Sequence, residues 1–174
     1  MDLKVVLEKL SSYKIFNYLF PGILLAGIGS NMTSLQLLFD NLVIGVFVYY
    51  FYGIVISRVG SIIIEPLFKK TRFIEFAPYE TYISACKIDE KISLLSEENN
   101  VYRTLISTFF CLFIVVLYEQ IKLTNSFLSE YSLLIVLTGL IVLFAFAYRK
   151  QTNYVKARID GALKETHVKK KTEV

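Results

Sequence analysis

The residues that most often carry catalysis or bind metals are few in this chain and widely spaced. The single histidine, His167, lies near the lysine-rich end, and the two cysteines, Cys86 and Cys111, form no CxxC pair. A zinc site needs several such ligands close together, so this spacing does not predict one. No Walker loop, GxGxxG or HExxH motif is present. We therefore expect no enzyme activity, no catalytic residue, no cofactor and no bound metal.

Basic and amide side chains offer binding chemistry instead. One group follows Pro66, and the other precedes a long apolar stretch that begins at Thr104. They are Lys69, Lys70, Arg72, Asn99, Asn100 and Arg103. Lysine and arginine with amide donors can bind a nucleotide-like anion or a cytoplasmic protein. The alternative is that these cations only reflect the lysine and arginine excess of cytoplasmic segments.

The composition indicates a membrane protein. Hydrophobic residues make up 55% of the 174 residues and charged residues 20%, whereas a soluble domain has about 45–50% and about 25%. Four stretches of 25, 17, 15 and 18 residues carry no charge, and about 20 residues suffice for a helix to cross a bilayer. The predicted crossings lie near Ile15–Ser30, Leu38–Ser57, Thr104–Tyr118 and Tyr131–Tyr148. A soluble bundle of very hydrophobic helices is the alternative.

The positive charges predict the orientation. Of 19 lysines and arginines, 18 lie in residues 1–14, 58–103 and 149–174. Cytoplasmic segments carry this excess. We therefore predict an all-α protein with four transmembrane helices, both termini in the cytoplasm, and a multi-pass location in a bacterial inner membrane.

Five segments follow from this topology. They are an amphipathic N-terminal helix (1–14), transmembrane hairpin 1 (15–58), a cytoplasmic helical segment (59–103), transmembrane hairpin 2 (104–148), and a C-terminal helix with a basic tail (149–174). In the cytoplasmic segment we expect one helix from Pro78 to about Lys87 and another from about Ser93. Pro66 should end or kink the preceding helix at Glu65. Residues 167–174 should be disordered.

Small residues recur every four positions in the second crossing and just beyond it. They are Gly53, Ser57 and Ser61, with Gly60 beside them. This spacing lets helix backbones approach closely. The contact can be with a helix of the same subunit or with another subunit.

The second crossing also contains the residues that best fit a pore. Asp40 and Asn41 lie at its outer end, and in a symmetric oligomer Asp40 would form a carboxylate ring of the kind found in cation pores. Gly45, Val48 and Tyr52 follow on roughly one helix face and would line the pore. The alternatives are an interfacial charge at Asp40 and ordinary aromatic packing below it.

Three further stretches suggest a family. They are RVGSIIIEP at 58–66, FAPYE at 76–80 and SEENNVYRT at 96–104. With four crossings and inside termini, the chain resembles small, uncharacterised bacterial inner-membrane proteins with four helices, some of which belong to phage-defence loci. The resemblance implies a membrane effector or sensor and adds antiviral defence to the expected roles.

These observations lead to two functional hypotheses. The first is a homo-oligomeric pore or channel-type effector gated through its cytoplasmic segment. The second is a non-conducting membrane scaffold or sensor that recruits a soluble cytoplasmic partner. Membrane lipid and further copies of the chain are the expected partners in the first, and a cytoplasmic protein joins them in the second.

Overall fold

The computed structural model describes residues 13–172, with side chains for all of these except Phe16, Ser126 and 162–172. Every regular element in this range is a helix. In chain order they are the π-helix η1 (Ile15–Leu19), α2 (Phe20–Met32), α3 (Leu42–Val59), the π-helix η2 (Gly60–Ile64), α4 (Glu65–Lys70), α5 (Tyr79–Ile88), α6 (Lys91–Thr124), α7 (Ser126–Glu130) and α8 (Ser132–Thr172). The predicted all-α class is confirmed for the described residues. The amphipathic helix predicted at 1–14 falls almost wholly outside them.

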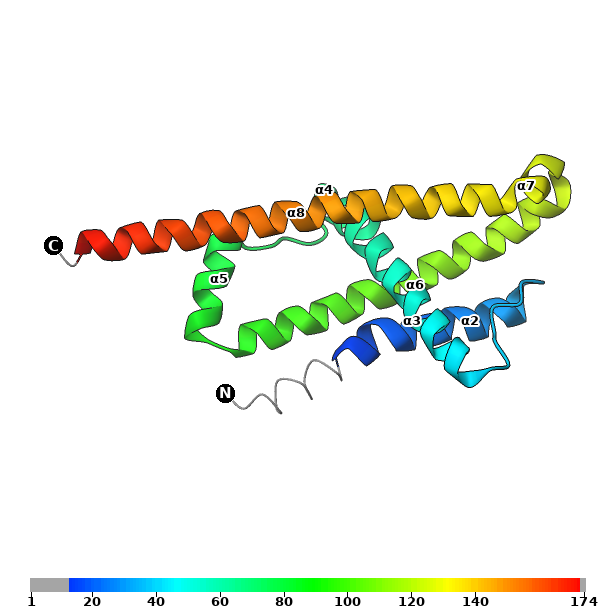
Figure 1. Cartoon of the computed structure of the whole chain (residues 1–174), viewed down its shortest axis with the longest axis horizontal. Helices are drawn as coiled ribbons and strands as arrows, with labels where there is room; N and C mark the ends of the chain where they lie inside the picture. The colour runs from blue at the N-terminus through cyan, green and yellow to red at the C-terminus, as the bar shows by residue number, and fades with distance from the viewer. Residues whose placement is uncertain (1–12, 173–174) are drawn as a thin grey trace.

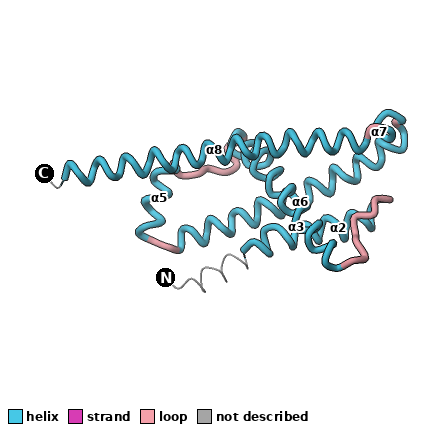
Figure 2. The backbone as a smooth tube through the Cα atoms, in the orientation of Figure 1, coloured by secondary structure: helices cyan, strands magenta, loops and turns pink. Residues whose placement is uncertain are grey.

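Two long helices, α6 and α8, form the frame of the molecule (Figure 1). They are joined by α7 at one end, and α5 lies between them at the other end. The core sits where α3 crosses this frame and contacts η1, α2 and α6. Helix α8 joins this core through α3 and η2. The segment 71–78, which links α4 to α5, runs beside α8 (Figure 2).

Three continuous helical stretches are long and apolar enough to cross a membrane: Leu42–Lys70, Lys91–Thr124 and Ser132–Gly161. In the most apolar part of the third, only 6% of the residues are buried, against 22% in the other two. An apolar helix that buries so little of itself needs lipid or another chain around it. The predicted first crossing is helical too, but it is divided between η1 and the 13-residue α2.

Two glycines allow α3 to lie directly against the first helical stretch. A Cβ atom on Gly53 would overlap the carbonyl group of Tyr18, and a Cβ atom on Gly22 would overlap that of Tyr49. Each helix therefore presents a glycine to the backbone of the other. In a membrane such close approach is a main source of helix association. Of the two partners considered for the small-residue face, a helix of the same subunit is the one that contacts Gly53.

Both π-helices directly precede a proline. The amide of Phe20 bonds to the Ile15 carbonyl before Pro21, and the amide of Glu65 bonds to the Gly60 carbonyl before Pro66. Proline has no amide hydrogen, and in an α-helix its ring collides with the carbonyl four residues earlier. The wider π turn changes that spacing, so the helix passes through both prolines.

Of the two alternatives for Pro66, an end or a kink, the helix does not end there, because η2 accommodates Pro66 and α4 continues to Lys70. One prediction about a helix end is wrong. The tail is not irregular from residue 167, because α8 continues to Thr172. No proline and no glycine follows Gly161 to interrupt it. The two helices predicted in the segment 59–103 are close to their predicted starts, with α5 at Tyr79 after Pro78 and α6 at Lys91.

We predict that Gly53→Ala lowers the free energy of unfolding by at least about 2 kcal/mol, because the added methyl group must displace backbone. Gly139→Ala in α8 is the matched control, since a Cβ atom added there would have no neighbour within 4 Å. Alanine favours a helix by about 0.5–1 kcal/mol over glycine, so Gly139→Ala should not destabilise. Unfolding in mixed detergent micelles measures both. Equal losses for the two variants would contradict the close contact.

Candidate functional site

A buried carboxylate joins three helices near the middle of the frame, where α4 lies beside α8 (Figure 1). The Glu65 side chain is 7% exposed, and its oxygens accept from Lys69 Nζ at 3.0 Å, Arg103 Nη1 at 2.6 Å and Lys150 Nζ at 3.2 Å. Lys69 belongs to the same helix as Glu65, whereas Arg103 lies on α6 and Lys150 on α8. We call these four side chains the Glu65 cluster. It fixes α4, α6 and α8 to one another.

The cluster is necessary once Glu65 is buried. Removing a carboxylate from water costs several kcal/mol, and close cations with good geometry offset that cost. The short bond from Arg103 is the best placed to do so, because a guanidinium donates in a fixed plane. Lys69 contributes less, since 46% of its side chain remains exposed and water screens it.

Lys150 has a second acceptor that explains its position. Its ammonium group donates to the Ser61 carbonyl at 2.6 Å. Ser61 lies five residues before Pro66, so in the π spacing of η2 its carbonyl would have bonded to the amide hydrogen that Pro66 lacks. A buried carbonyl without a donor is costly. Lys150 therefore supplies from α8 the hydrogen bond that the proline removes from the helix.

A cavity of about 530 Å³ opens beside the cluster. Its charged lining residues are Arg58, Lys69, Arg103, Lys150 and Glu65. Four cations against one carboxylate leave a formal charge of +3. In the described part of the chain the Arg58 side chain has neither a hydrogen bond nor an ion pair. The cavity therefore has more positive charge than its own carboxylate balances.

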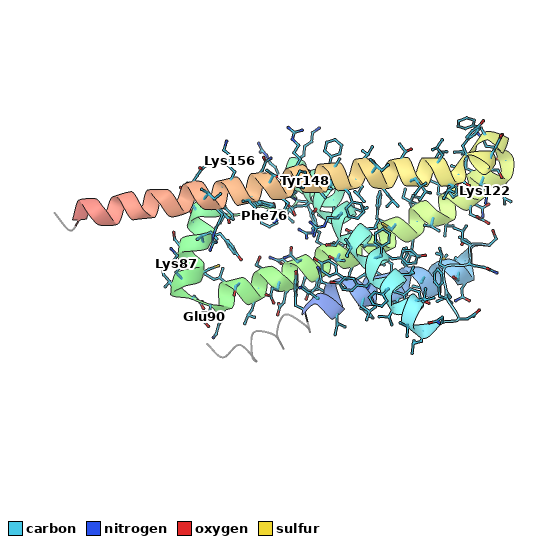
Figure 3. The ribbon with its side chains drawn as sticks, in the orientation of Figure 1. Phe76, Lys87, Glu90, Lys122, Tyr148 and Lys156 are labelled. Atoms are coloured by element: carbon cyan, nitrogen blue, oxygen red, sulfur yellow. The ribbon has the colours of Figure 1, made fainter. Side chains whose placement is uncertain are left out.

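Aromatic rings form the rest of the wall. Tyr79 of α5 and Tyr154 of α8 lie nearly parallel, with centroids 6.5 Å apart. The ammonium groups of Lys69 and Lys150 lie 4.2 Å from the Phe76 ring centroid and 5.7 Å from that of Tyr154. Figure 3 places Phe76 beneath α8, in the space enclosed by α5, α6 and α8. These cation–π contacts orient both lysines toward the cavity wall.

Tyr82 adds a fourth ring and a neutral hydroxyl group. A hydrogen bond with Ser96 lowers the pKa of Tyr82, but burial and the neighbouring Cys86 outweigh it and leave that pKa above its usual value. The phenol is therefore uncharged at physiological pH. Ser96, Asn100 and Gln151 add further polar groups to the same wall.

Arg103 lies between this cavity and a second one of about 350 Å³. Both are lined by Arg103, Glu65, Phe76, Ser96 and Asn100. The Nη1 atom of Arg103 is bound to Glu65, but its Nε atom is buried without a partner among the described residues. A buried donor of this kind is costly until something accepts from it.

The structure brings together part of the predicted binding group. Lys69, Asn100 and Arg103 line the larger cavity, and Asn99 lines the smaller one. Lys70 and Arg72 line neither. Lys70 is exposed on α4. Arg72 has a φ angle of 57° in the turn after α4, a conformation that is uncommon for a residue other than glycine.

The predicted pore residues share no single exposed face. Asp40 and Asn41 are exposed, but the Asn41 side chain accepts from the amides of Val43 and Ile44 and so begins α3. Gly45 is buried beneath the Tyr49 ring of its own helix. Val48 and Tyr52 are half-buried, and the Tyr52 ring lies 6.5 Å from that of Tyr49.

The predicted packing residues all lie inside the subunit. Gly53, Ser57, Gly60 and Ser61 are buried, and Gly60 faces Ser107 of α6. This is the intra-subunit alternative of the two considered for these residues.

Several buried polar contacts lie outside the sequence-based predictions. Asn17 of η1 shares a hydrogen bond of 2.9 Å with Thr104, and Ser107 and Thr108 bond to carbonyls of their own helix. Toward the α7 end of α6, Ser34 donates its hydroxyl group to Glu119. No sequence motif marked the Asn17–Thr104 and Ser34–Glu119 pairs, because each of these two joins residues more than 80 positions apart. The signal available in the sequence was a polar residue between apolar neighbours, which indicates a polar contact inside the subunit.

The described residues hold no group of three or more histidine, cysteine, aspartate or glutamate side chains that could bind a metal. Comparison with protein-family models, with curated proteins and with solved structures finds no match for this chain. The interpretation of the site therefore depends on its own geometry.

We predict that Glu65→Gln lowers the free energy of unfolding by about 3 kcal/mol, because it leaves the half-buried cations of Arg103 and Lys150 without a counter-charge. Lys69→Gln is the control on the same helix. Its loss should stay below about 1 kcal/mol, since Lys69 is half exposed. Unfolding of both variants in mixed micelles tests this ranking. Equal losses would mean that the buried carboxylate does not fix the helices.

Proposed function

We propose that this protein is a homo-oligomeric pore or channel-type effector of a bacterial inner membrane, gated through its cytoplasmic segment. The observation that carries the proposal is the Glu65 cluster, in which α4, directly after the first hairpin, meets α6 and α8, the two helices that contain the second hairpin. A ligand that changed these ion pairs would change how the membrane helices are arranged. The resemblance in sequence is what adds anti-phage defence to this proposal, and we propose no reaction.

The proposal includes four crossings with both termini in the cytoplasm. The distribution of lysine and arginine supports this orientation. The Glu65 cluster and α5 would then face the cytoplasm, with α7 on the other side.

Labelling of introduced cysteines tests the topology. In a chain with Cys86→Ser and Cys111→Ser, we predict that a membrane-impermeant maleimide labels Thr124→Cys in intact spheroplasts, because this residue would lie outside. Lys156→Cys should react only after permeabilisation. Both residues are exposed on the surface of the subunit. Labelling of Lys156→Cys in intact spheroplasts would contradict cytoplasmic placement of α8.

Oligomerisation is supported by the apolar surface that α8 leaves uncovered. Leu133, Leu134 and Ile141 are each more than half exposed. One subunit has too few helices to enclose a path for ions, so a pore requires several copies. Asp40 is exposed and free to form a ring at the outer mouth.

The second candidate is a non-conducting scaffold, and one observation favours it. The polar side chains Asn17, Thr104, Ser107 and Thr108 point into the subunit. The faces of the long helices that remain exposed are largely apolar. A pore lined by such faces would resist wetting. A scaffold needs only the basic segment for its partner.

We predict that the purified protein in liposomes conducts cations, and that Asp40→Asn lowers the cation preference because it removes the ring charge. Glu130→Gln is the control, since it removes an exposed carboxylate from α7 at the same end of the molecule. Reversal potentials under a salt gradient measure the preference. A reversal potential that does not change in Asp40→Asn would contradict the Asp40 ring. Liposomes that conduct no ions would contradict the pore and favour the scaffold.

A further inference from the structure

We propose that the cavity beside the Glu65 cluster binds a phosphate group of an anionic ligand. The inference rests on the proposed function in that it takes this cavity as the regulatory site, and it names the ligand class. Binding itself does not require conduction, so the two can be tested separately.

The first argument is the unbalanced charge. Arg58, Arg103 and Lys150 line the cavity together, yet Glu65 is its single carboxylate. A phosphate group carries up to two negative charges and several acceptor oxygens, and arginine and lysine are its usual partners. Arg58 has no partner of its own in the described residues, so it can bind an anion without breaking the cluster.

The second argument is the unsatisfied donor. Arg103 gives one nitrogen to Glu65, while its buried Nε atom has no acceptor among the described residues. Arginine binds phosphate best through two parallel donors. An incoming oxygen that accepted from Nε would complete the hydrogen bonds of Arg103 and remove the cost of the buried donor.

The third argument concerns what is attached to the phosphate. Phe76, Tyr79, Tyr82 and Tyr154 border the same cavity, and flat rings stack on such side chains. Asn100 can both donate and accept at the edge of a ring. The volume of about 530 Å³ falls within the range of small-molecule sites, about 300–1,000 Å³. These features favour a nucleotide.

A phospholipid headgroup is the other source of the same chemistry. Ser61 and Lys150 immediately follow apolar stretches of α3 and α8, so the cavity lies near the expected membrane surface. A headgroup would reach the cations from the bilayer and leave the aromatic wall unused. The two sources therefore differ in whether the ring contributes to binding.

Protein in nanodiscs of neutral phosphatidylcholine provides the test. We expect adenosine triphosphate to bind more tightly than tripolyphosphate, which lacks the ring, and adenosine not to bind measurably. Isothermal titration measures all three. Nanodiscs that contain phosphatidylglycerol form the lipid arm, in which thermal stabilisation of the protein reports headgroup binding.

Arg58→Gln is the main variant, because its side chain forms no ion pair among the described residues and the chain should fold normally. We expect about tenfold weaker binding of the nucleotide, the effect of losing one charged hydrogen bond. Lys150→Gln should weaken binding too, but it also disturbs the cluster. Lys70→Gln is the matched control, since Lys70 is exposed and lines neither cavity.

The outcomes are distinct. Nucleotide binding that weakens in Arg58→Gln and not in Lys70→Gln supports a soluble ligand, and lipid stabilisation with the same dependence supports a headgroup. No response to either, or equal effects of the two variants, overturns the phosphate site. A protein that binds but does not conduct would keep the site and lose the pore. A protein that conducts but does not bind the ligand would contradict the phosphate site and leave the pore standing.

Discussion

The buried carboxylate of Glu65 determines how three helices of this protein can be arranged. A charge with so little access to water is tolerable only while cations lie against it, and here those cations come from α4, α6 and α8. Any rearrangement that separated these helices would leave the carboxylate with Lys69 of its own helix as its remaining cation in the cluster. The same ion pairs therefore hold α4, α6 and α8 in one arrangement.

The bond from Lys150 to the Ser61 carbonyl shows how local backbone chemistry and tertiary structure depend on each other. Pro66 removes a donor from the helix, η2 shifts the hydrogen-bond spacing, and a side chain from α8 satisfies the carbonyl that remains. Proline within a membrane helix is commonly accommodated through neighbouring helices and local π turns. Here the accommodating side chain also belongs to the Glu65 cluster. The proline, the π turn and the cavity are therefore parts of one arrangement.

Much of the fold follows from the sequence, because charge-free length and helix-start residues act locally. The gaps between charged residues indicated the three long apolar helices, and Pro78 indicated the start of α5. Lys69, Asn100 and Arg103 were identified as binding residues because they lie in two polar groups beside expected helix boundaries, one after Pro66 and one before Thr104. Lys150 was not identified, since it lies 85 residues from Glu65 and resembles any lysine that follows an apolar stretch. The π turn before Pro66 was not predicted, because the rule for proline in an α-helix allows only an end or a kink.

The attachment of α8 has a mechanical consequence. This helix has 41 residues, about 62 Å at 1.5 Å per residue, yet its described contacts with the rest of the chain lie near its middle. Phe144 stacks on Phe51, Lys150 binds Ser61 and Glu65, and Tyr154 stacks on Tyr79. Its Ser132 end is joined to α7, so a tilt of α8 about the contacts near Lys150 would also move α7. A tilt of about 5° around Lys150 would move Ser132, about 27 Å away along the helix, by about 2 Å, and would move the opposite end of α8 in the opposite direction.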